Sequence, residues 1–121
     1  MSMDALVSQI KRHPQYHKVG MILCHNGVVR GTSRDGRKVR GLQVSVDNDK
    51  LAEIIAEKKE QTGIVEILVQ INAGRDLRIG DDVMQLVVAG DIRENVLATL
   101  TQTLNAIKSS VTRKTEFYVE E

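Results

Sequence analysis

The feature that most constrains the fold is a nearly uninterrupted apolar run, DDVMQLVVAG, at residues 81–90. A strand with one face in water alternates apolar and polar residues, whereas a strand buried on both faces is apolar almost throughout. Residues 81–90 therefore predict a strand that other elements cover on both sides. The preceding apolar run, IVEILVQI at 64–71, predicts a second strand, and the turn-rich segment NAGRDLRIG connects the two.

Helices that could cover such a sheet are indicated by the spacing of apolar residues. The longest is predicted at about 92–109, and its apolar stripe consists of Ile92, Val96, Leu97, Leu100, Leu104, Ile107 and Val111. A short amphipathic helix is predicted at 3–12. A third helix, with the sequence LAEIIAEKKEQTG, is predicted to be capped by Asn48 or Asp49 and to end at Gly63.

A β-hairpin is predicted in the first half of the chain, with strands at roughly 19–30 and 38–46. Both runs are rich in β-forming residues, and the second alternates apolar with polar side chains. Asp35-Gly36 between them predicts a tight turn, because glycine adopts positive φ without steric cost. The C-terminal segment TRKTEFYVEE also favours a strand, and we expect it at the edge of a sheet.

Positive charge is concentrated around this predicted turn, although the chain as a whole has a formal net charge of only +1. That balance excludes a generally basic nucleic-acid binder but permits a local anion site. We interpret three cations as the solvated tip of the hairpin: Arg34, Arg37 and Lys38. Arg30 ends an apolar strand, where both an anion-binding role and an ordinary surface position are consistent with the sequence.

The order of predicted elements indicates a single α+β domain over residues 1–121, with helices packed on a mainly antiparallel sheet. Cys24 is the only cysteine, which excludes an internal disulfide and a cysteine zinc cluster and favours a reducing compartment. We interpret it as a buried structural residue. No run approaches the roughly 20 apolar residues of a membrane span, so we expect a cytoplasmic protein.

Three segments occur in an order and spacing that are typical of one family. They are GMILCHNGVVRG, INAGRDLRIGDDVMQLVVAG and the long helix from Arg93 to Lys108. Together, over roughly residues 20–116, they resemble the large, catalytic subunit of molybdopterin synthase, the MoaE-like family. The resemblance implies an α/β hammerhead-type fold and a homodimer.

The resemblance also implies an activity, that of a sulfurtransferase in molybdenum cofactor biosynthesis. Its partner would be a ubiquitin-like small subunit whose C-terminal Gly-Gly thiocarboxylate enters the large subunit. The reaction would transfer sulfur to cyclic pyranopterin monophosphate, a phosphorylated pterin, and make the dithiolene of molybdopterin. The resemblance implies that this step needs neither a metal nor an organic cofactor.

Residue by residue, the resemblance implies a site made of cations. Lys108 falls on a lysine near the end of the long helix, where it would stabilise an oxyanion at the acyl carbon or link covalently to the carrier. Arg30 and Arg93 fall on family arginines that would bind the phosphorylated substrate. Arg40 is a further candidate for the same task, by charge and position alone.

Several positions depart from the family pattern. An ungapped match puts Thr115 on a second active-site lysine, and Lys114 comes into register only with a one-residue bulge. Ile92 stands in place of a histidine at the start of the long helix, and Asn72-Ala73 replace a His-Arg pair. The alternative is therefore a catalytically impaired homologue that acts as a dimeric binding module for a ubiquitin-like carrier tail or a phosphorylated pterin.

The positions of Arg93 and Lys108 constrain any site that they share. They are fifteen residues apart on one predicted helix, which corresponds to about 22 Å along its axis. If both serve one small pterin, a second subunit must complete the site, which agrees with the implied homodimer. Nucleic acid is not favoured as a partner, because no aromatic stacking platform accompanies the basic segment.

Overall fold

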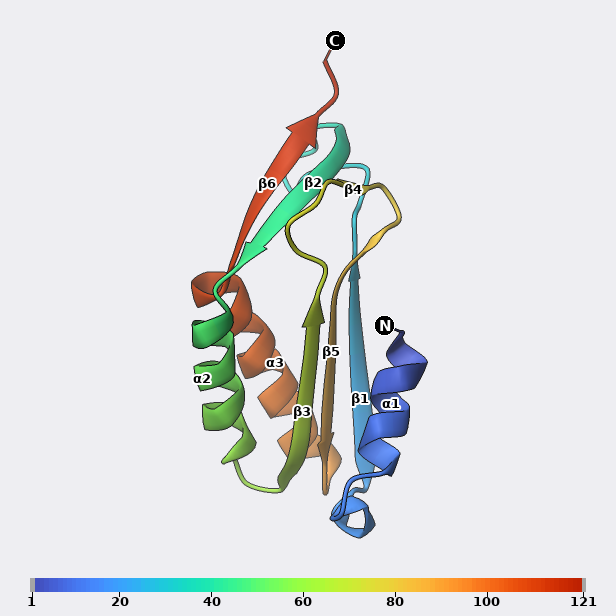
Figure 1. Cartoon of the computed structure of the whole chain (residues 1–121), viewed down its shortest axis with the longest axis vertical. Helices are drawn as coiled ribbons and strands as arrows, with labels where there is room; N and C mark the ends of the chain where they lie inside the picture. The colour runs from blue at the N-terminus through green and yellow to red at the C-terminus, as the bar shows by residue number, and fades with distance from the viewer. Residues whose placement is uncertain (1, 121) are drawn as a thin grey trace.

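The computed structural model describes residues 2–120, and these form three α-helices, a short 3-10 helix and six strands. In chain order they are α1 (Met3–Lys11), η1 (Tyr16–Lys18), β1 (Met21–Val28), β2 (Val39–Val46), α2 (Asn48–Lys59), β3 (Ile64–Ile71), β4 (Leu77–Arg78), β5 (Asp82–Gly90), α3 (Arg93–Ser110) and β6 (Thr112–Tyr118). Figure 1 shows a sheet flanked by helices in the lower part of the molecule and a smaller sheet at the upper end.

The large sheet has the strand order β1-β5-β3, and both pairings are antiparallel. Its central strand β5 has four consecutive residues with no exposed surface: Leu86, Val87, Val88 and Ala89. Val87 and Ala89 pack with α1 on one face, while Leu86 and Val88 pack with Val96 of α3 on the other (Figure 1). The prediction that residues 81–90 form a strand covered on both faces is confirmed.

The small sheet has the strand order β4-β2-β6 and is also antiparallel. Its edge strand β6 confirms the prediction for the C-terminal segment. Strand β4 lies within the turn-rich connection and pairs with Gly41 and Leu42 of β2. Buried apolar side chains join the small sheet to its neighbouring loops, and they are Val29, Leu42, Val44 and Leu77.

The predicted hairpin of residues 19–30 with 38–46 is wrong, and the expected single sheet is two sheets. Strand β1 pairs along its length with β5, whereas β2 pairs with β4 and β6. The turn itself is present, because Gly36 has a φ of +88° and a single bridge joins Thr32 to Lys38. Beyond that bridge the strands separate, because β1 buries apolar side chains against β5 while those of β2 pack into a different cluster.

Both ends of α2 differ from the prediction. Asp47, rather than Asn48 or Asp49, caps α2, because its side chain accepts a 3.0 Å hydrogen bond from the Lys50 N–H. The helix also ends earlier than predicted, at Lys59 with Glu60 as its C-cap, and Gly63 lies in the following turn with a φ of +76° that favours glycine.

The long helix α3 buries only part of its predicted apolar stripe. Val96 and Ile107 have no exposed surface, whereas Ile92 and Leu97 remain 53% and 46% exposed. The start of α3 therefore presents an apolar surface that the rest of the chain does not cover.

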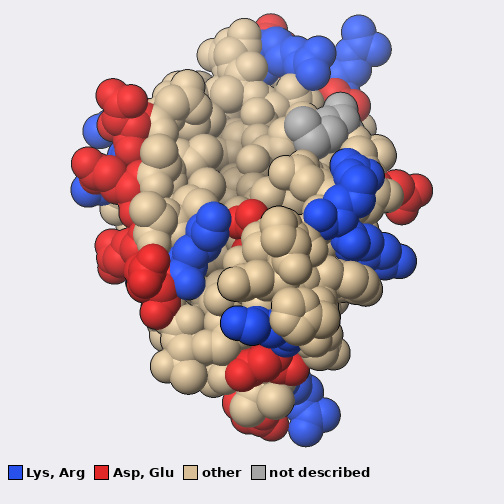
Figure 2. Space-filling model, turned by 60° about the horizontal axis from the view of Figure 1, so that its bottom comes forward, with Lys and Arg blue, Asp and Glu red and all other residues tan. Residues whose placement is uncertain are grey.

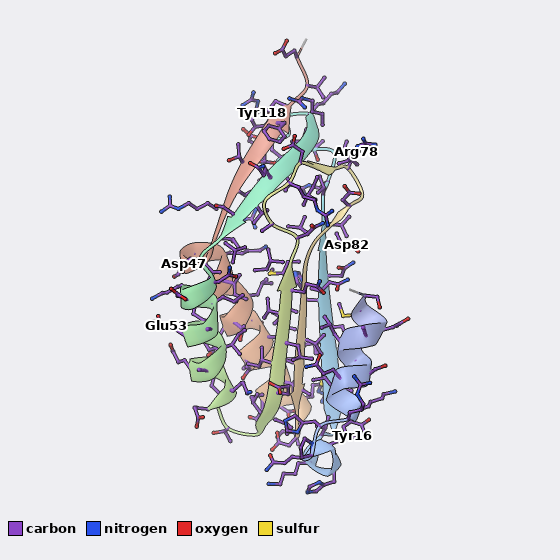
Figure 3. All side chains as sticks on the ribbon, viewed as in Figure 1. Tyr16, Asp47, Glu53, Arg78, Asp82 and Tyr118 are labelled. Carbon is purple, nitrogen blue, oxygen red and sulfur yellow. The ribbon has the colours of Figure 1, made fainter. Side chains whose placement is uncertain are left out.

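Charged and aromatic side chains are distributed unevenly over the surface. Tyr16 and Tyr118 lie at opposite ends of the molecule (Figure 3). The Arg37 guanidinium stacks on the Tyr118 ring, 3.5 Å from its centre. Acidic side chains gather along the left edge of Figure 2, over α2 and its C-terminus: Asp49, Glu53, Glu57 and Glu60. Within residues 2–120, no helix is long and apolar enough to cross a membrane.

Candidate functional site

A cavity of about 390 Å³ lies where the two sheets meet. We call it the junction cavity. Strands β1, β2, β5 and β6, the end of β3, the last turn of α3 and the 31–38 turn all contribute to its wall. The lining residues are His25, Gly27, Val28, Arg34, Leu42, Val44, Ile71, Val83, Met84, Lys108, Thr112 and Lys114.

Cationic and apolar side chains line the junction cavity. Lys108, Lys114 and Arg34 line it, and none of the described lining residues is an aspartate or glutamate. Cations in a cavity that no described carboxylate lines favour an anionic ligand, and arginine in particular matches carboxylate and phosphate geometry. The cavity is therefore suited to a small anion or to the anionic end of a longer chain.

Lys108 and Lys114 come together because β6 follows α3 almost directly. Lys108 lies in the last turn of the helix, and β6 turns back from there to pair with β2. In that register Lys114 is opposite the buried Val44, whereas Thr115 is opposite the exposed Gln43. Opposite residues of an antiparallel pair point to the same face, so Lys114 faces the cavity and Thr115 faces away.

The register shows which of the two residues faces the cavity, and the assignment of Lys114 to the second lysine stays a prediction. The pairing of β6 runs without interruption from Thr112 to Phe117, so Lys114 needs no bulge in β6. The irregularity is in the partner strand, between Val39 and Gly41. Lys114 remains about half exposed and has the Glu116 carboxylate 4.0 Å from its Nζ.

His25 is a lining residue that sequence reasoning missed as part of the site. It is half-buried on β1, and its Nε2 lies 3.6 Å from the position that a β-carbon on Gly27 would take. Burial lowers the pKa of the imidazole, and the positive charge of Lys108 lowers it further. Period-two alternation could have found it, because Leu23, two residues earlier, packs on the α3 side of the large sheet.

Arg34 is exposed at the turn, as interpreted, and it also lines the junction cavity. Arg37 stacks on Tyr118, away from it. Lys38 is exposed beside the turn, as predicted. The 31–38 turn therefore contributes one cation to the cavity. No periodicity in the sequence of the turn indicates which of its cations this is.

The three other predicted arginines do not line the junction cavity of a single chain. Arg30 is exposed and donates from Nε to the Thr32 carbonyl at 2.8 Å. The Arg40 guanidinium lies 5.2 Å from the centre of the Phe117 ring. Arg93 is 75% exposed at the first residue of α3, at the opposite end of that helix from Lys108. Their roles in substrate binding stay predictions.

The remaining candidates lie in other surroundings. Asn72 and Ala73 line a separate polar pocket, where Asn72 accepts a 2.7 Å hydrogen bond from Arg75 Nε and donates to the Asp82 carbonyl. Cys24 is exposed rather than buried, and partial desolvation raises the pKa of its thiol. In the part of the chain that the structure describes, no three His, Cys, Asp or Glu side chains gather in a metal-binding group.

Comparison with known protein families identifies the family of this chain. The family model described as MoaE protein matches residues 1–110. This chain belongs to the MoaE family. The match confirms the family that the three sequence segments indicated. No curated protein sequence matches it significantly.

Solved structures of the MoaE family share its fold. Molybdopterin synthase from Staphylococcus aureus is 23% identical with a TM-score of 0.73, covering 86% of this chain and 78% of that one. Molybdopterin cofactor biosynthesis protein E from Burkholderia multivorans is 21% identical with a TM-score of 0.76, covering 98% and 84%. A complex of subunits 1 and 2 of molybdopterin-converting factor from Helicobacter pylori is 18% identical with a TM-score of 0.71, covering 100% and 86%. These likenesses confirm the predicted α+β fold class.

Proposed function

We propose that this chain is the large subunit of a molybdopterin synthase. It would transfer sulfur from a thiocarboxylated small carrier subunit to cyclic pyranopterin monophosphate. The observation that carries the proposal is the convergence of Lys108 and Lys114 on one cavity in a MoaE-family chain. Their convergence supports the anion chemistry that this reaction needs, because both the thiocarboxylate and the substrate phosphate are negatively charged.

The chemistry proposed for the junction cavity uses the two lysines as fixed positive charges. Attack of the thiocarboxylate sulfur on a substrate carbon forms a C–S bond while a C–O bond at that carbon breaks. The oxygen leaves with its electron pair and takes up a proton, and the carrier is joined to the substrate as a thioester. Water then attacks the acyl carbon, the acyl C–S bond breaks, and the carrier leaves as a carboxylate while sulfur stays on the substrate. The oxyanion formed in that second attack is stabilised by Lys108 or Lys114, whose ammonium groups line the cavity.

The partner proposed for the junction cavity is the tail of a ubiquitin-like subunit that ends in Gly-Gly. The Helicobacter pylori relative is a complex of two different subunits, which supports a small-subunit partner here. A cavity of about 390 Å³ is within the range of small-ligand pockets. It can accept the slim end of such a chain, because glycine brings no side chain to be accommodated.

A homodimer is proposed because one chain separates two of the predicted site residues. Arg93 and Lys108 lie at opposite ends of α3, about 22 Å apart along the axis, so one small pterin can meet both only across a subunit interface. Two features support a second copy beside β1. This edge strand, MILCHNGV, has no Lys, Arg, Asp or Glu to discourage pairing, and α3, which packs against it, begins with the exposed Ile92 and Leu97.

A second candidate function is a binding module without turnover. It is favoured by Ile92, which stands in place of a family histidine and offers no group for proton transfer. The purified protein, mixed with a thiocarboxylated Gly-Gly carrier and the pterin precursor, separates the two functions. Sulfur incorporated into the pterin supports the synthase, whereas carrier binding without sulfur transfer leaves only the module. If the carrier does not bind, the synthase is wrong, and if the pterin precursor does not bind either, the module is wrong as well.

A further inference from the structure

His25 is the lining residue of the junction cavity that can change its charge near neutral pH, because imidazole has an ordinary pKa of about 6.5. The charged groups that face the cavity with it are Lys108 from α3, Lys114 from β6 and Arg34 from the 31–38 turn. The contributions of β2, β5 and the end of β3 are apolar. No described carboxylate lines the cavity to stabilise an imidazolium.

These surroundings favour the neutral imidazole of His25 when no anion is bound. Protonation would add a charge among three cations at a half-buried position, and both burial and Lys108 lower the pKa of the imidazole. The neutral ring is nevertheless placed to respond, because its Nε2 lies over Gly27, where the β1 backbone borders the cavity. A negative charge brought into the cavity offsets the cations and favours the protonated ring.

We propose that the junction cavity binds anions together with a proton, which His25 takes up. The ring then donates a charge-assisted hydrogen bond to the bound oxyanion, in addition to the charges of the two lysines and Arg34. When the anion leaves, the proton leaves with it. The anion is a carboxylate, thiocarboxylate or phosphate. Its natural source is the carrier tail or the substrate, and this assignment rests on the proposed function.

The linkage has a defined sign and size. Because the bound state has the higher His25 pKa, the extra affinity is present at low pH and is lost as pH rises through the pKa of the bound state. Between the pKa values of the free and bound states, one proton is taken up per anion, so the affinity rises up to tenfold for each unit that the pH falls. Outside that window the affinity does not depend on pH through this residue.

Calorimetry with the full chain tests the proposal with two probes whose own charge is constant above pH 5.5. One is an N-acetylated peptide that ends in Gly-Gly, which represents the carrier tail, and the other is sulfate, which represents the phosphate. Titrations in buffers of different protonation enthalpy measure the protons taken up. We expect up to one proton per bound anion, and an affinity that falls as pH rises from 5.5 to 8.5.

Two variants identify the group that takes up the proton. His25→Gln should bind with the affinity that the wild type has at high pH, and with no proton uptake. His17→Gln, an exposed histidine of η1 outside the cavity, should keep the wild-type uptake. Proton uptake with the peptide alone assigns the coupling to the carrier tail, and proton uptake with sulfate alone assigns it to the phosphate subsite.

The wild-type protein alone can overturn the inference, so the result does not depend on how well a variant folds. If the probes bind and neither of them brings proton uptake between pH 5.5 and 8.5, the coupling is refuted and the proposed function is left intact. If neither probe binds at any pH, the junction cavity is not an anion site, and both the coupling and the proposed function are wrong. Unchanged proton uptake in His25→Gln also refutes the assignment to this histidine.

Discussion

Replacement of Gly41 by alanine should destabilise the small sheet, which forms one wall of the junction cavity. A β-carbon on Gly41 would overlap the Leu77 carbonyl oxygen, and it would lie 3.5 Å from the Leu77 carbonyl carbon and 3.9 Å from the Arg78 Cα. These are backbone atoms of β4, the strand paired with Gly41, so no side-chain rotation can relieve the overlap. The strand must move, and the buried Leu77 moves with it.

The expected cost is that of overpacking a filled site, about 1–3 kcal/mol in the free energy of unfolding. For a chain of this length, each kcal/mol lowers the melting temperature by roughly 3–6 °C. Thermal and urea unfolding followed by circular dichroism measure both quantities. Anion binding should weaken as well, because Leu42, which pairs with Leu77 in β4, lines the junction cavity.

Gly31→Ala is the matched control, since it adds the same methyl group nearby. Its β-carbon would lie 3.7 Å from Ile79 Cδ1, an ordinary contact, and the φ of Gly31 is not positive. Its stability should equal that of the wild type or exceed it by about 0.4–1 kcal/mol, because alanine reduces the freedom of the unfolded chain. Equal melting temperatures for the two variants would show that β4 does not approach Gly41 as described.

Three further changes test other parts of the structure. Lys108→Ala and Lys114→Ala should each weaken binding of a Gly-Gly peptide about 5- to 30-fold. This is the low end for charge-assisted contacts, because both lysines are exposed. Thr115→Ala should change the affinity less than twofold, and an equal loss in that variant would contradict the register of β6. Leu86→Ala, at a residue with no exposed surface, should cost about 2–5 kcal/mol in urea unfolding, and a loss below 1 kcal/mol would mean that β5 is not the centre of the core. The pKa of Asp91 is lowered, because the Asn95 side-chain amide and the Ile92 N–H donate hydrogen bonds to its carboxylate. This stabilisation is present above the pKa that Asp91 has in the unfolded chain, and it is lost as pH falls through the pKa of the folded state. Asp91→Asn should therefore flatten the loss of stability measured between pH 5 and 2.

Several elements of the fold were determined by the sequence itself, because each depends on neighbours within a few residues. The apolar run at 81–90 required a strand covered on both faces, and β5 is that strand. The Asp35-Gly36 turn and the helix of α3 follow from local φ preference and from period 3.6, respectively. The order of these elements also carried the resemblance to the MoaE family.

Only the tertiary structure decided which strands pair and which side chains share a cavity. A turn between two β-rich runs favours a hairpin locally, but β1 pairs with β5, which is distant in sequence, and packs its apolar side chains in the cluster that β5 shares. The face of each residue in β6 depends on its register with β2, so Lys114 rather than Thr115 joins Lys108. His25 and Arg34 meet these lysines for the same reason, because a cavity between two sheets brings together residues that no local pattern relates.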